Sequence, residues 1–247
     1  MNVNNHIYIK DLHLAYGKKT VLKISNISVA AKSLIVVVGR NGSGKSTLLR
    51  CLVNLQKAQS GDIFLKGKNI NNLKPIERAK LISFVSPHPV NIPHLSVYDL
   101  IAGGRAPYTS ALNKLTSKDL THINNAIDLL NLNSFKKRKL NELSDGERQK
   151  CMIARACAQD TPIMILDEPT AFLDYPSRYE LLNSLKMLAT EANKCVVFSS
   201  HDIDLAMPQA DMCWFLENKN AVIGSRSDII QNPNFLKFIN GAGSNKN

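Results

Sequence analysis

The spacing of hydrophobic residues changes along the chain, and each change predicts a different kind of element. Residues 7–16 alternate apolar and polar side chains, and residues 21–29 form a second apolar stretch behind a turn at Gly17. Such stretches indicate strands of a small antiparallel sheet. Farther on, residues 34–38 and 163–166 are apolar throughout, which is typical of parallel strands covered on both faces.

Helical spacing takes over in the middle of the chain. Prolines stiffen a loop that starts at Pro87, and apolar residues then recur every three to four positions within 97–101 and 120–130. We find no convincing strand pattern from about residue 87 to about residue 160. The middle of the chain is therefore predicted to be a helical insertion in an α/β pattern.

The remaining pattern completes a single domain that spans residues 1–247. Residues 1–86 and 161–247 are expected to form its core, and residues 87–160 a helical subdomain. The shorter elements expected in the core are a turn at 60–62, strands at 63–65, 81–85 and 195–198, a helix through 181–188, a hairpin of 212–216 with 221–224, and a polar, disordered tail at 243–247.

Composition narrows the class of protein. The 247 residues are 44% hydrophobic and 21% charged, as in ordinary globular proteins, and no apolar run approaches the roughly twenty residues that cross a bilayer. The five cysteines show no CxxC spacing and mostly lie in apolar runs, so we expect small buried side chains in a reducing cytosol. The net charge of +11 suggests an acidic partner, although the densest basic run, 136–139, also fits a solvated surface.

A glycine-rich loop follows the buried strand 34–38 and precedes a helical pattern. Its sequence, GRNGSGKST, fits the phosphate-binding pattern GxxxxGK[ST]. Its backbone N–H groups can surround an anion, Lys45 can reach the outer phosphates, and Ser46 can offer its hydroxyl to Mg²⁺. A plain glycine turn would not explain the lysine and the hydroxyls, so the loop predicts binding of a nucleoside triphosphate. The nucleotide-binding residues predicted here are Gly39, Asn41, Gly42, Ser43, Gly44, Lys45, Ser46 and Thr47.

A second motif ends the apolar run 163–166. Asp167 can hold Mg²⁺ directly or through water, and Glu168 can polarise an attacking water. Adjacent side chains point in different directions, so the two carboxylates can serve different roles. Alone, such a pair is usually an ordinary exposed turn, but together with a phosphate loop it predicts a hydrolytic site.

A third motif begins the helical pattern that follows Leu143. Ser144 and Glu147 have the spacing of a capping box, an ordinary structural device at a helix start. A helix N-terminus with a serine hydroxyl and Gly146 is also an anion site. Both interpretations can hold at once.

These motifs, in this order, resemble the ATP-binding subunits of ABC transporters over essentially the whole chain. Residues 39–47 resemble the Walker A loop, 143–147 the LSGGQ signature and 163–168 Walker B. Residues 172–174 resemble the D-loop. The resemblance implies an α/β P-loop NTPase fold with a RecA-like, mostly parallel sheet, an N-terminal antiparallel β-subdomain and an inserted helical subdomain.

Two single residues extend the resemblance. Tyr16 falls where the family has an aromatic residue that stacks on adenine, and His201, in the run SSHD, resembles the family's switch histidine. The residues that the resemblance adds to the ATP site are Tyr16, Ser144, Gly146, Glu147 and Asp174, and those that would hold Mg²⁺ are Ser46 and Asp167.

The resemblance also implies a mechanism. Two copies would pair head to tail, so that Ser144 and Gly146 of one close on the γ-phosphate held by Lys45 of the other. Glu168 would act as general base, and His201 would bind the γ-phosphate and steady the attack. Closure on ATP and opening after hydrolysis would drive transport, through differential contact with the γ-phosphate in the two states.

A short stretch in the helical insertion points to a subfamily. Residues 101–108, IAGGRAPY, resemble the GRxPY stretch of importers for iron-siderophores, haem and cobalamin. This resemblance implies two membrane-spanning permease subunits, an extracytoplasmic substrate-binding protein, and a place at the cytoplasmic face of the inner membrane. The basic charge would then suit an anionic leaflet, and no nucleic-acid partner is expected.

The sequence departs from the family where a glutamine joins the core to the helical insertion. Counting back from the GRxPY stretch places Pro87 at that position, and proline has neither a side-chain amide nor a backbone N–H. Our hypothesis is that Ser86 or His88 takes over this role by way of a water.

The signature departs as well. Asp145 stands where the family usually has glycine, and Glu147 where it has glutamine. Both add negative charge near a polyphosphate, which should weaken ATP-driven closure unless a basic neighbour such as Arg148 offsets it.

Two other functions are consistent with parts of the sequence. An ABC-type ATPase acting on nucleic acid would use the positive charge, but such relatives usually carry a long coiled-coil insertion or two cassettes in one chain. A regulatory subunit that binds ATP and barely hydrolyses it is favoured by Pro87 and Asp145. Against the nucleic-acid function, this chain has one cassette, and its insertion is short and carries the GRAPY stretch.

Overall fold

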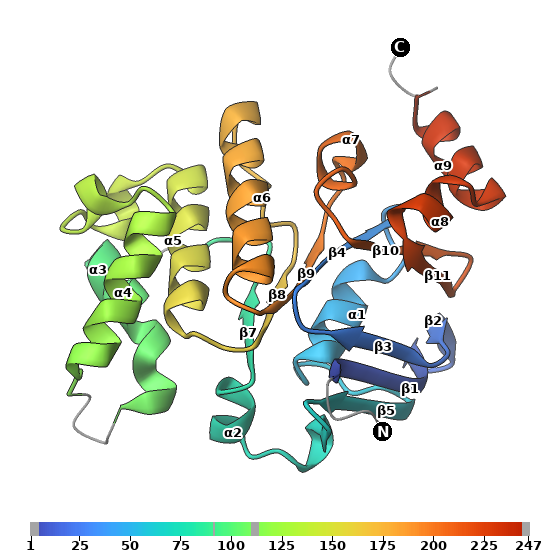
Figure 1. Cartoon of the computed structure of the whole chain (residues 1–247), viewed down its shortest axis with the longest axis horizontal. Coiled ribbons are helices and arrows are strands. Elements are labelled where there is room, and N and C mark those ends of the chain that lie inside the picture. Colours follow the sequence, from blue (N-terminus) through green and yellow to red (C-terminus); the bar gives the residue numbers. More distant parts are fainter. Residues whose placement is uncertain (1–4, 91, 110–113, 244–247) are drawn as a thin grey trace.

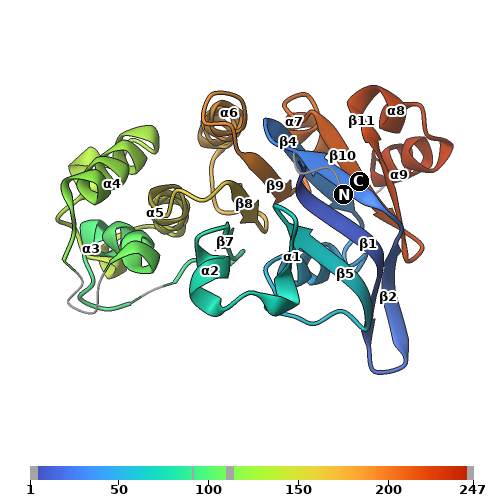
Figure 2. The same cartoon turned by 60° about the horizontal axis from the view of Figure 1, so that its bottom comes forward.

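The computed structural model describes residues 5–90, 92–109 and 114–243. Its strands lie in one 11-stranded sheet, with the helices α3, α4 and α5 gathered at one end (Figures 1 and 2). The strands are β1 (Asn5–Tyr16), β2 (Lys19–Ile24), β3 (Ile27–Ala30), β4 (Ser33–Gly39), β5 (Ser60–Leu65), β6 (Lys68–Asn69), β7 (Ile82–Val85), β8 (Ile163–Leu166), β9 (Cys195–Ser199), β10 (Met212–Glu217) and β11 (Asn220–Ser225).

The other elements of the described chain are α-helices and 3-10 helices. The α-helices are α1 (Lys45–Leu52), α2 (Pro75–Ala79), α3 (Val97–Ala102), α4 (Ser117–Leu129), α5 (Asp145–Ala158), α6 (Tyr175–Thr190), α7 (Ile203–Ala206), α8 (Arg226–Ile230) and α9 (Pro233–Gly243). The 3-10 helices are η1 (Ile70–Asn72), η2 (Gly103–Tyr108), η3 (Asn133–Phe135) and η4 (Leu140–Glu142).

The sheet has a parallel part and an antiparallel part. Strands β10, β4, β9, β8 and β7 run parallel in that order, whereas β1 pairs antiparallel with β2, β3 and β5. Strand β11 joins the parts, because it pairs with β10 in a hairpin and with β2 through Asn220 and Lys23. The expected α/β class, with an N-terminal antiparallel portion, is confirmed.

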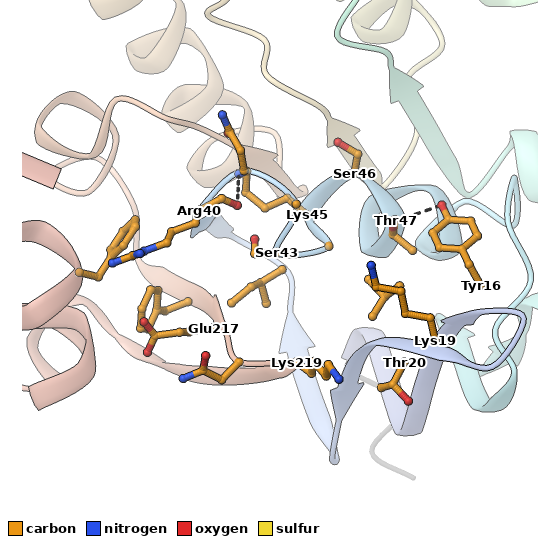
Figure 3. A pocket seen from close by; sticks show the side chains of 18 of the residues that line it. Tyr16, Lys19, Thr20, Arg40, Ser43, Lys45, Ser46, Thr47, Glu217 and Lys219 are labelled. Carbon is orange, nitrogen blue, oxygen red and sulfur yellow. Dashed lines mark hydrogen bonds between the residues drawn. The ribbon is translucent and has the colours of Figure 1, made fainter. Parts of the chain in front are cut away.

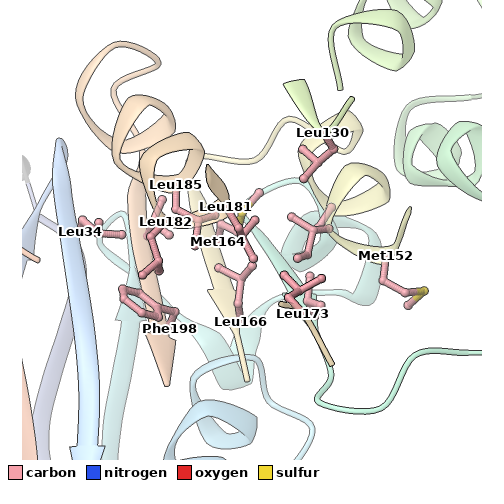
Figure 4. Close-up of a cluster of buried hydrophobic side chains, with 14 of the residues drawn as sticks. Leu34, Leu130, Met152, Met164, Leu166, Leu173, Leu181, Leu182, Leu185 and Phe198 are labelled. Carbon is pink, nitrogen blue, oxygen red and sulfur yellow. The ribbon is translucent and has the colours of Figure 1, made fainter. Parts of the chain in front are cut away.

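The parallel strands are buried on both faces, as their continuous apolar runs predict. In β4, Leu34, Val36 and Val38 belong to one core cluster with α5 and α6, and Ile35 and Val37 to another with α1. Figure 4 shows the first cluster, in which leucines of α6 lie over Leu34 and over residues of β8 and β9. This double cover fixes the ends of β4 and β8, where the polar motifs begin.

Two predictions in the antiparallel part are wrong. The apolar stretch 21–29 is not one strand, because β1 pairs with β3 through its first half and with β2 through its second half, so the chain must turn between them. The predicted turn at 60–62 lies inside β5, where Ser60 pairs with His13. Gly61 permits this irregular pairing, since a Cβ there would lie 2.3 Å from the carbonyl oxygen of Asp11.

Every described element between β7 and β8 is a helix, apart from an isolated bridge between Ser96 and Lys139. The division at residues 87 and 160 stays a prediction. Helix α2 lacked a clear sequence pattern and was not predicted. The polar tail, from residue 244 on, lies outside the described residues. Within the described ranges, no helix is long and apolar enough to cross a membrane.

The GRxPY stretch lies inside the helical part. Arg105 is 4% exposed, donates from Nε to Asp119 Oδ1 at 2.8 Å, and donates from a second nitrogen to the Ala158 carbonyl at 2.8 Å. Hydrogen bonds from Thr116, followed by that from Arg105, lower the pKa of Asp119 to about 2. Arg105 therefore connects the segments around α3, α4 and α5 through a buried charge pair, and it has a structural role here.

Candidate functional site

An open cleft of about 810 Å³ lies at the carboxyl ends of the parallel strands (Figure 3). This volume suits a ligand of nucleotide size, and the carboxyl ends of parallel strands are where open α/β sheets bind ligands. The predicted site residues that line the cleft are Tyr16, Asn41, Gly42, Ser43, Gly44, Lys45, Ser46, Thr47, Glu168 and His201.

The glycine-rich loop connects β4 to α1 as its sequence predicts. Gly39 has to be glycine, because a Cβ there would lie 2.5 Å from the Leu216 carbonyl oxygen. Gly44, with φ of 102°, directly precedes the first helical residue, Lys45. The loop therefore directs the free N–H groups at the start of α1 toward the cleft, where they favour an anion.

Lys45 is held at the floor of the cleft. Its Nζ donates to the carbonyl oxygens of Gly39 at 2.8 Å and of Arg40 at 3.4 Å, and the side chain is 6% exposed. Burial lowers the pKa of Lys45 below its usual value, while the carboxylates of Glu168 and Asp167 act in the opposite direction. A phosphate would replace the two carbonyl contacts with a full negative charge.

Asp167 and Glu168 follow β8 directly. Asp167 is fully buried, and its Oδ1 accepts a hydrogen bond of 2.7 Å from the hydroxyl of Ser199 at the end of β9. The same hydroxyl accepts from the backbone N–H of Glu168 at 2.8 Å. Glu168 has φ of 52°, so the chain turns there and its side chain lies toward the cleft. Ser199 thus fixes both carboxylate positions.

His201 lies next to Glu168 in the cleft. The Nε2 atom of His201 is 2.6 Å from Glu168 Oε1, so the imidazole N–H donates to the carboxylate. The His201 side chain is 47% exposed and Glu168 is 31% exposed. A carboxylate with a histidine partner thus lies within reach of solvent, an arrangement that can accept a proton from a water.

The residues proposed for Mg²⁺ fit a cation. Asp167 Oδ2 is buried and has no hydrogen-bond partner among the described residues, although its charge needs one. The motif that contains Asp167 ends beside the cleft that Ser46 lines. A carboxylate oxygen and a hydroxyl oxygen are hard ligands of the kind that Mg²⁺ takes.

Tyr16 lies at the other end of the cleft from Arg40 and Glu217 (Figure 3). The residue is 56% exposed, and its hydroxyl lies 3.0 Å from Gln56 Oε1 and 3.4 Å from Thr47 Oγ1. A ring in this position can offer a face to a base whose phosphates lie on the loop.

The residues of the signature, and Asp174, lie outside the cleft, at the starts of α5 and α6. Ser144 caps α5 as the capping box predicts, accepting from the Glu147 N–H at 3.2 Å, and Glu147 Oε2 accepts from the Ser144 N–H at 2.7 Å. Asp174 caps α6 and accepts from the Ser177 N–H at 3.1 Å. None of Ser144, Gly146, Glu147 and Asp174 lines the cleft as the described chain forms it.

Two contacts modify the signature predictions. Asp145 forms an ion pair with Arg148, so a basic neighbour does offset this extra charge. Hydrogen bonds from Ser144 lower the pKa of Glu147 and keep it ionised. Gly146 packs on the D-loop, since a Cβ there would lie 2.7 Å from the Phe172 carbonyl oxygen.

The loop that contains Pro87 does not reach the cleft in the described state. The Ser86 hydroxyl donates to the His88 carbonyl at 3.0 Å, and His88 is exposed. Neither residue is among those lining the cleft within the part of the chain that the structure describes. The hypothesis that Ser86 or His88 replaces the missing glutamine stays a prediction.

Sequence reasoning missed several residues that the fold brings to the site. Ser199 could have been found from the sequence, because it places a hydroxyl at the end of an apolar strand run, two residues before His201. Lys19, Arg40 and Lys219 also line the cleft, from the turn after Tyr16, the glycine-rich loop and the β10–β11 turn. Nothing in the local sequence marks Lys19 and Lys219, because only the pairing of distant strands brings them together.

The fold and the cleft define a P-loop NTPase. A family model described as ABC transporter matches residues 22–171, which is more than half of the chain. The chain therefore belongs to the ABC transporter family, as an ATP-binding subunit, and it is an ATPase.

Relatives and solved structures agree with this assignment. The chain is 38% identical over 213 residues to an uncharacterized ABC transporter ATP-binding protein of Methanocaldococcus jannaschii, covering 86% of this chain and 73% of that protein. It is 34% identical to the petrobactin import ATP-binding protein YclP of Bacillus subtilis, covering 87% and 85% of the two chains. The dimeric structure of MJ0796, a bacterial ABC transporter cassette, matches with a TM-score of 0.79 and 26% identity over 89% of this chain and 98% of that one.

Proposed function

We propose that two copies of this chain hydrolyse ATP as a head-to-tail dimer and so power an importer. The observation that carries the hydrolytic part is the cleft in which Lys45, Glu168 and His201 meet above Asp167. The signature residues, which lie outside this cleft, would then complete the site of the other copy. The dimeric structure of the MJ0796 cassette supports this arrangement.

Each residue of the cleft has a defined part in the proposed reaction. Lys45 exchanges its carbonyl contacts for the outer phosphates of ATP, and Tyr16 stacks on the base. Glu168 accepts the proton of the water that attacks the γ-phosphate. His201 turns from Glu168 to the γ-phosphate, which frees the carboxylate for that proton.

Asp167 and Ser46 would hold Mg²⁺, which neutralises charge on the phosphates when bound. Asp167 can do so without rearranging, because Ser199 already orients its carboxylate and leaves Oδ2 unpaired among the described side chains. Ser144 and Gly146 of the second copy would contact the γ-phosphate from the opposite side. Their contact exists only while ATP is intact, which makes closure depend on the nucleotide.

The proposed cargo is an iron-siderophore, haem or cobalamin-type molecule. The GRxPY stretch and the relative named for petrobactin import support this part of the proposal. The chain would act through two membrane-spanning permease subunits, at the cytoplasmic face of the membrane, with an extracytoplasmic substrate-binding protein delivering the cargo. No nucleic acid takes part.

The test is to tag the protein in its own cell, solubilise membranes gently and identify what co-purifies by mass spectrometry. A polytopic membrane protein in about equal amount is the expected result. Deleting the gene for that partner or for this chain should then abolish uptake of the same iron chelate. Recovery of nucleic acid or ribosomal proteins without a membrane subunit would contradict the proposal.

A weakly hydrolysing regulatory subunit remains the second candidate. Two departures favour it, namely Pro87 in place of a glutamine and Asp145 in the signature. The turnover of the assembled complex separates the two functions. An importer subunit accelerates ATP hydrolysis when the partner and cargo are added, whereas a regulatory subunit binds ATP with similar affinity and shows no such acceleration.

A further inference from the structure

The position of Tyr16 relative to the phosphate loop is set by a contact that no motif contains. Tyr16 is the last residue of β1 and pairs only with Lys19 of β2 there, and a bulge lies just before it at Leu14 and Ala15. Gly17 then turns the chain with φ of 56°. Backbone pairing therefore holds Tyr16 at the tip of a hairpin arm, and its ring needs a further contact to stay in register with α1.

The hydroxyl of Tyr16 supplies that contact. Gln56 Oε1 is an acceptor only, so the Tyr16 O–H donates to it at 3.0 Å, and a lone pair of the same oxygen can accept from the Thr47 hydroxyl at 3.4 Å. Figure 3 shows Tyr16 with its hydroxyl toward Thr47. The ring is thus tied by its far end and leaves a face exposed.

Gln56 is itself attached to the phosphate-binding helix. Its backbone N–H donates to the carbonyl oxygen of Arg50 in the last turn of α1, at 3.3 Å, and the N–H of Leu55 donates to the same oxygen at 2.9 Å. Thr47 belongs to the first turn of that helix. The tyrosine hydroxyl therefore contacts the first turn of the short helix whose N-terminus faces the phosphates, and also Gln56, which is hydrogen-bonded to the last turn of that helix.

We propose that Gln56 is a positioning residue, which fixes the ring of Tyr16 at a set distance from the phosphate loop so that base and phosphates of ATP are bound together. This inference rests on the proposed function, because it takes Tyr16 as the platform for the base. Gln56 touches no nucleotide atom. It restricts the motion of the ring before ATP binds. The conformational entropy of the ring is then not lost on binding, and the affinity for ATP is higher.

The test is a double-mutant cycle on ATP affinity, with Gln56→Leu, Tyr16→Phe and both together. Both single changes remove the hydrogen bond between Tyr16 and Gln56, and Tyr16→Phe also removes the 3.4 Å contact with Thr47. Gln56→Leu should raise Kd and KM for ATP about fivefold, the value of one neutral hydrogen bond, and Tyr16→Phe at least as much. The double variant should be no weaker than Tyr16→Phe alone. The kcat of Gln56→Leu should stay unchanged, since Gln56 does not touch the reacting atoms. Affinity for inorganic tripolyphosphate, which has no base, should not change.

Two controls separate positioning from general damage. Gln59→Leu makes the same substitution three residues along, at an exposed side chain outside the cleft, and should bind ATP like the wild type. Gln56→Glu keeps an acceptor oxygen for the tyrosine and should retain most of the affinity, and this retention should vanish when Tyr16→Phe is added.

The outcomes distinguish this inference from the proposed function. If Tyr16→Ala weakens ATP binding but Gln56→Leu does not, or if the two single effects add in the double variant, the positioning role is wrong and the base platform stands. If Tyr16→Ala itself leaves ATP affinity unchanged, the platform is wrong and the positioning role falls with it.

Discussion

The cleft and the signature helix end contain the two halves of the proposed ATP site, and they differ in how their polar groups are satisfied. Next to the cleft, directly before Glu168, the buried Asp167 Oδ2 has no hydrogen-bond partner among the described residues. At the start of α5, Ser144 and Glu147 satisfy each other in a closed capping box. The cleft is thus built to take up a ligand, whereas the helix end is stable without one.

This difference explains how each copy can be stable alone although the proposed ATP site is divided between two copies. A helix end that is capped by its own side chains is stable while the copies are apart, because the Ser144 hydroxyl and the Glu147 carboxylate accept hydrogen bonds from backbone N–H groups there. The same serine hydroxyl and N–H groups are exposed enough to contact a phosphate later. Changes in the cleft should therefore affect ATP binding and hydrolysis in each copy, and changes at the start of α5 should affect hydrolysis only in the assembled dimer.

The largest effect should come from Glu168→Gln in the cleft. Loss of the general base should lower turnover by about a thousandfold, while ATP binding persists because Lys45 and the loop are untouched. Turnover and equilibrium ATP binding, measured on the same preparation, check this. Glu217→Gln, which removes another carboxylate that lines the same cleft, is the matched control. Comparable losses in both variants would remove Glu168 from the role of base.

The next largest effect should come from breaking the buried ion pair between Arg105 and Asp119 in the helical part. Asp119→Asn leaves the Arg105 charge buried without its partner and should lower the free energy of unfolding by about 3 kcal/mol. Because the folded pKa of Asp119 is about 2, below its unfolded value of about 3.9, the wild-type contribution is full above pH 4 and is lost as the pH falls toward 2.

Denaturant titrations of wild type and Asp119→Asn between pH 7 and pH 3 test this sign. The difference between the two proteins should shrink as the pH falls, since protonation and mutation remove the same charge. ATP binding at pH 7 should remain intact in the variant, because the cleft is not involved. A stability difference that grows toward low pH would contradict the assignment of the ion pair.

Ser144→Ala should have an intermediate effect, namely a small loss of stability in each copy and a loss of activity that appears only in the dimer. Loss of the cap should lower the free energy of unfolding by about 1 kcal/mol. Loss of the phosphate contact should lower ATPase activity about tenfold, which corresponds to the free energy of one hydrogen bond to a charged group. Ser225→Ala is the control, because Ser225 caps α8 through the same kind of capping box. If both variants lose activity equally, Ser144 acts as a cap and nothing more.

The smallest effect is expected at the extra charge of the signature. Asp145→Asn removes a carboxylate that faces the polyphosphate in the proposed dimer and frees Arg148 from its ion pair. ATPase activity should rise about twofold at low ionic strength, and the gain should decline as salt screens the charges. Steady-state rates across a salt series measure it. A fall in activity would show that the ion pair itself supports closure.

The features predicted from the sequence were those that depend on neighbours along the chain. The β4–loop–α1 unit needs only the run 34–39 and the motif after it, and the cap at Ser144 needs only Glu147 three residues on. The split of 21–29 into β2 and β3 could not be foreseen, because it follows from how β1 divides its length between two partners.

The unforeseen part of the site also depends on distant pairing. Ser199 reaches Asp167 because β9 lies beside β8 in register, with Phe198 opposite Leu166. Gln56 reaches Tyr16 because the segment that follows α1 lies beside the end of β1. Hydrophobic spacing predicts that such strands exist, but it does not say which strand ends meet.

The pairing of β7 with β8 has a consequence for the order of folding. These strands are neighbours in the sheet, with Val85 opposite Leu166, yet the whole helical part of the chain lies between them. Closing so long a loop is slow and entropically costly until the intervening chain is compact. The helices, whose contacts are local, should therefore form first and shorten the loop. Strand β8, which Asp167 and Glu168 follow, would then be added to a nascent chain only after the helical segment has been synthesised. Strand β4 pairs with β9 and β10, which are synthesised later still, so the phosphate loop and the two carboxylates should reach their final places together, late in synthesis.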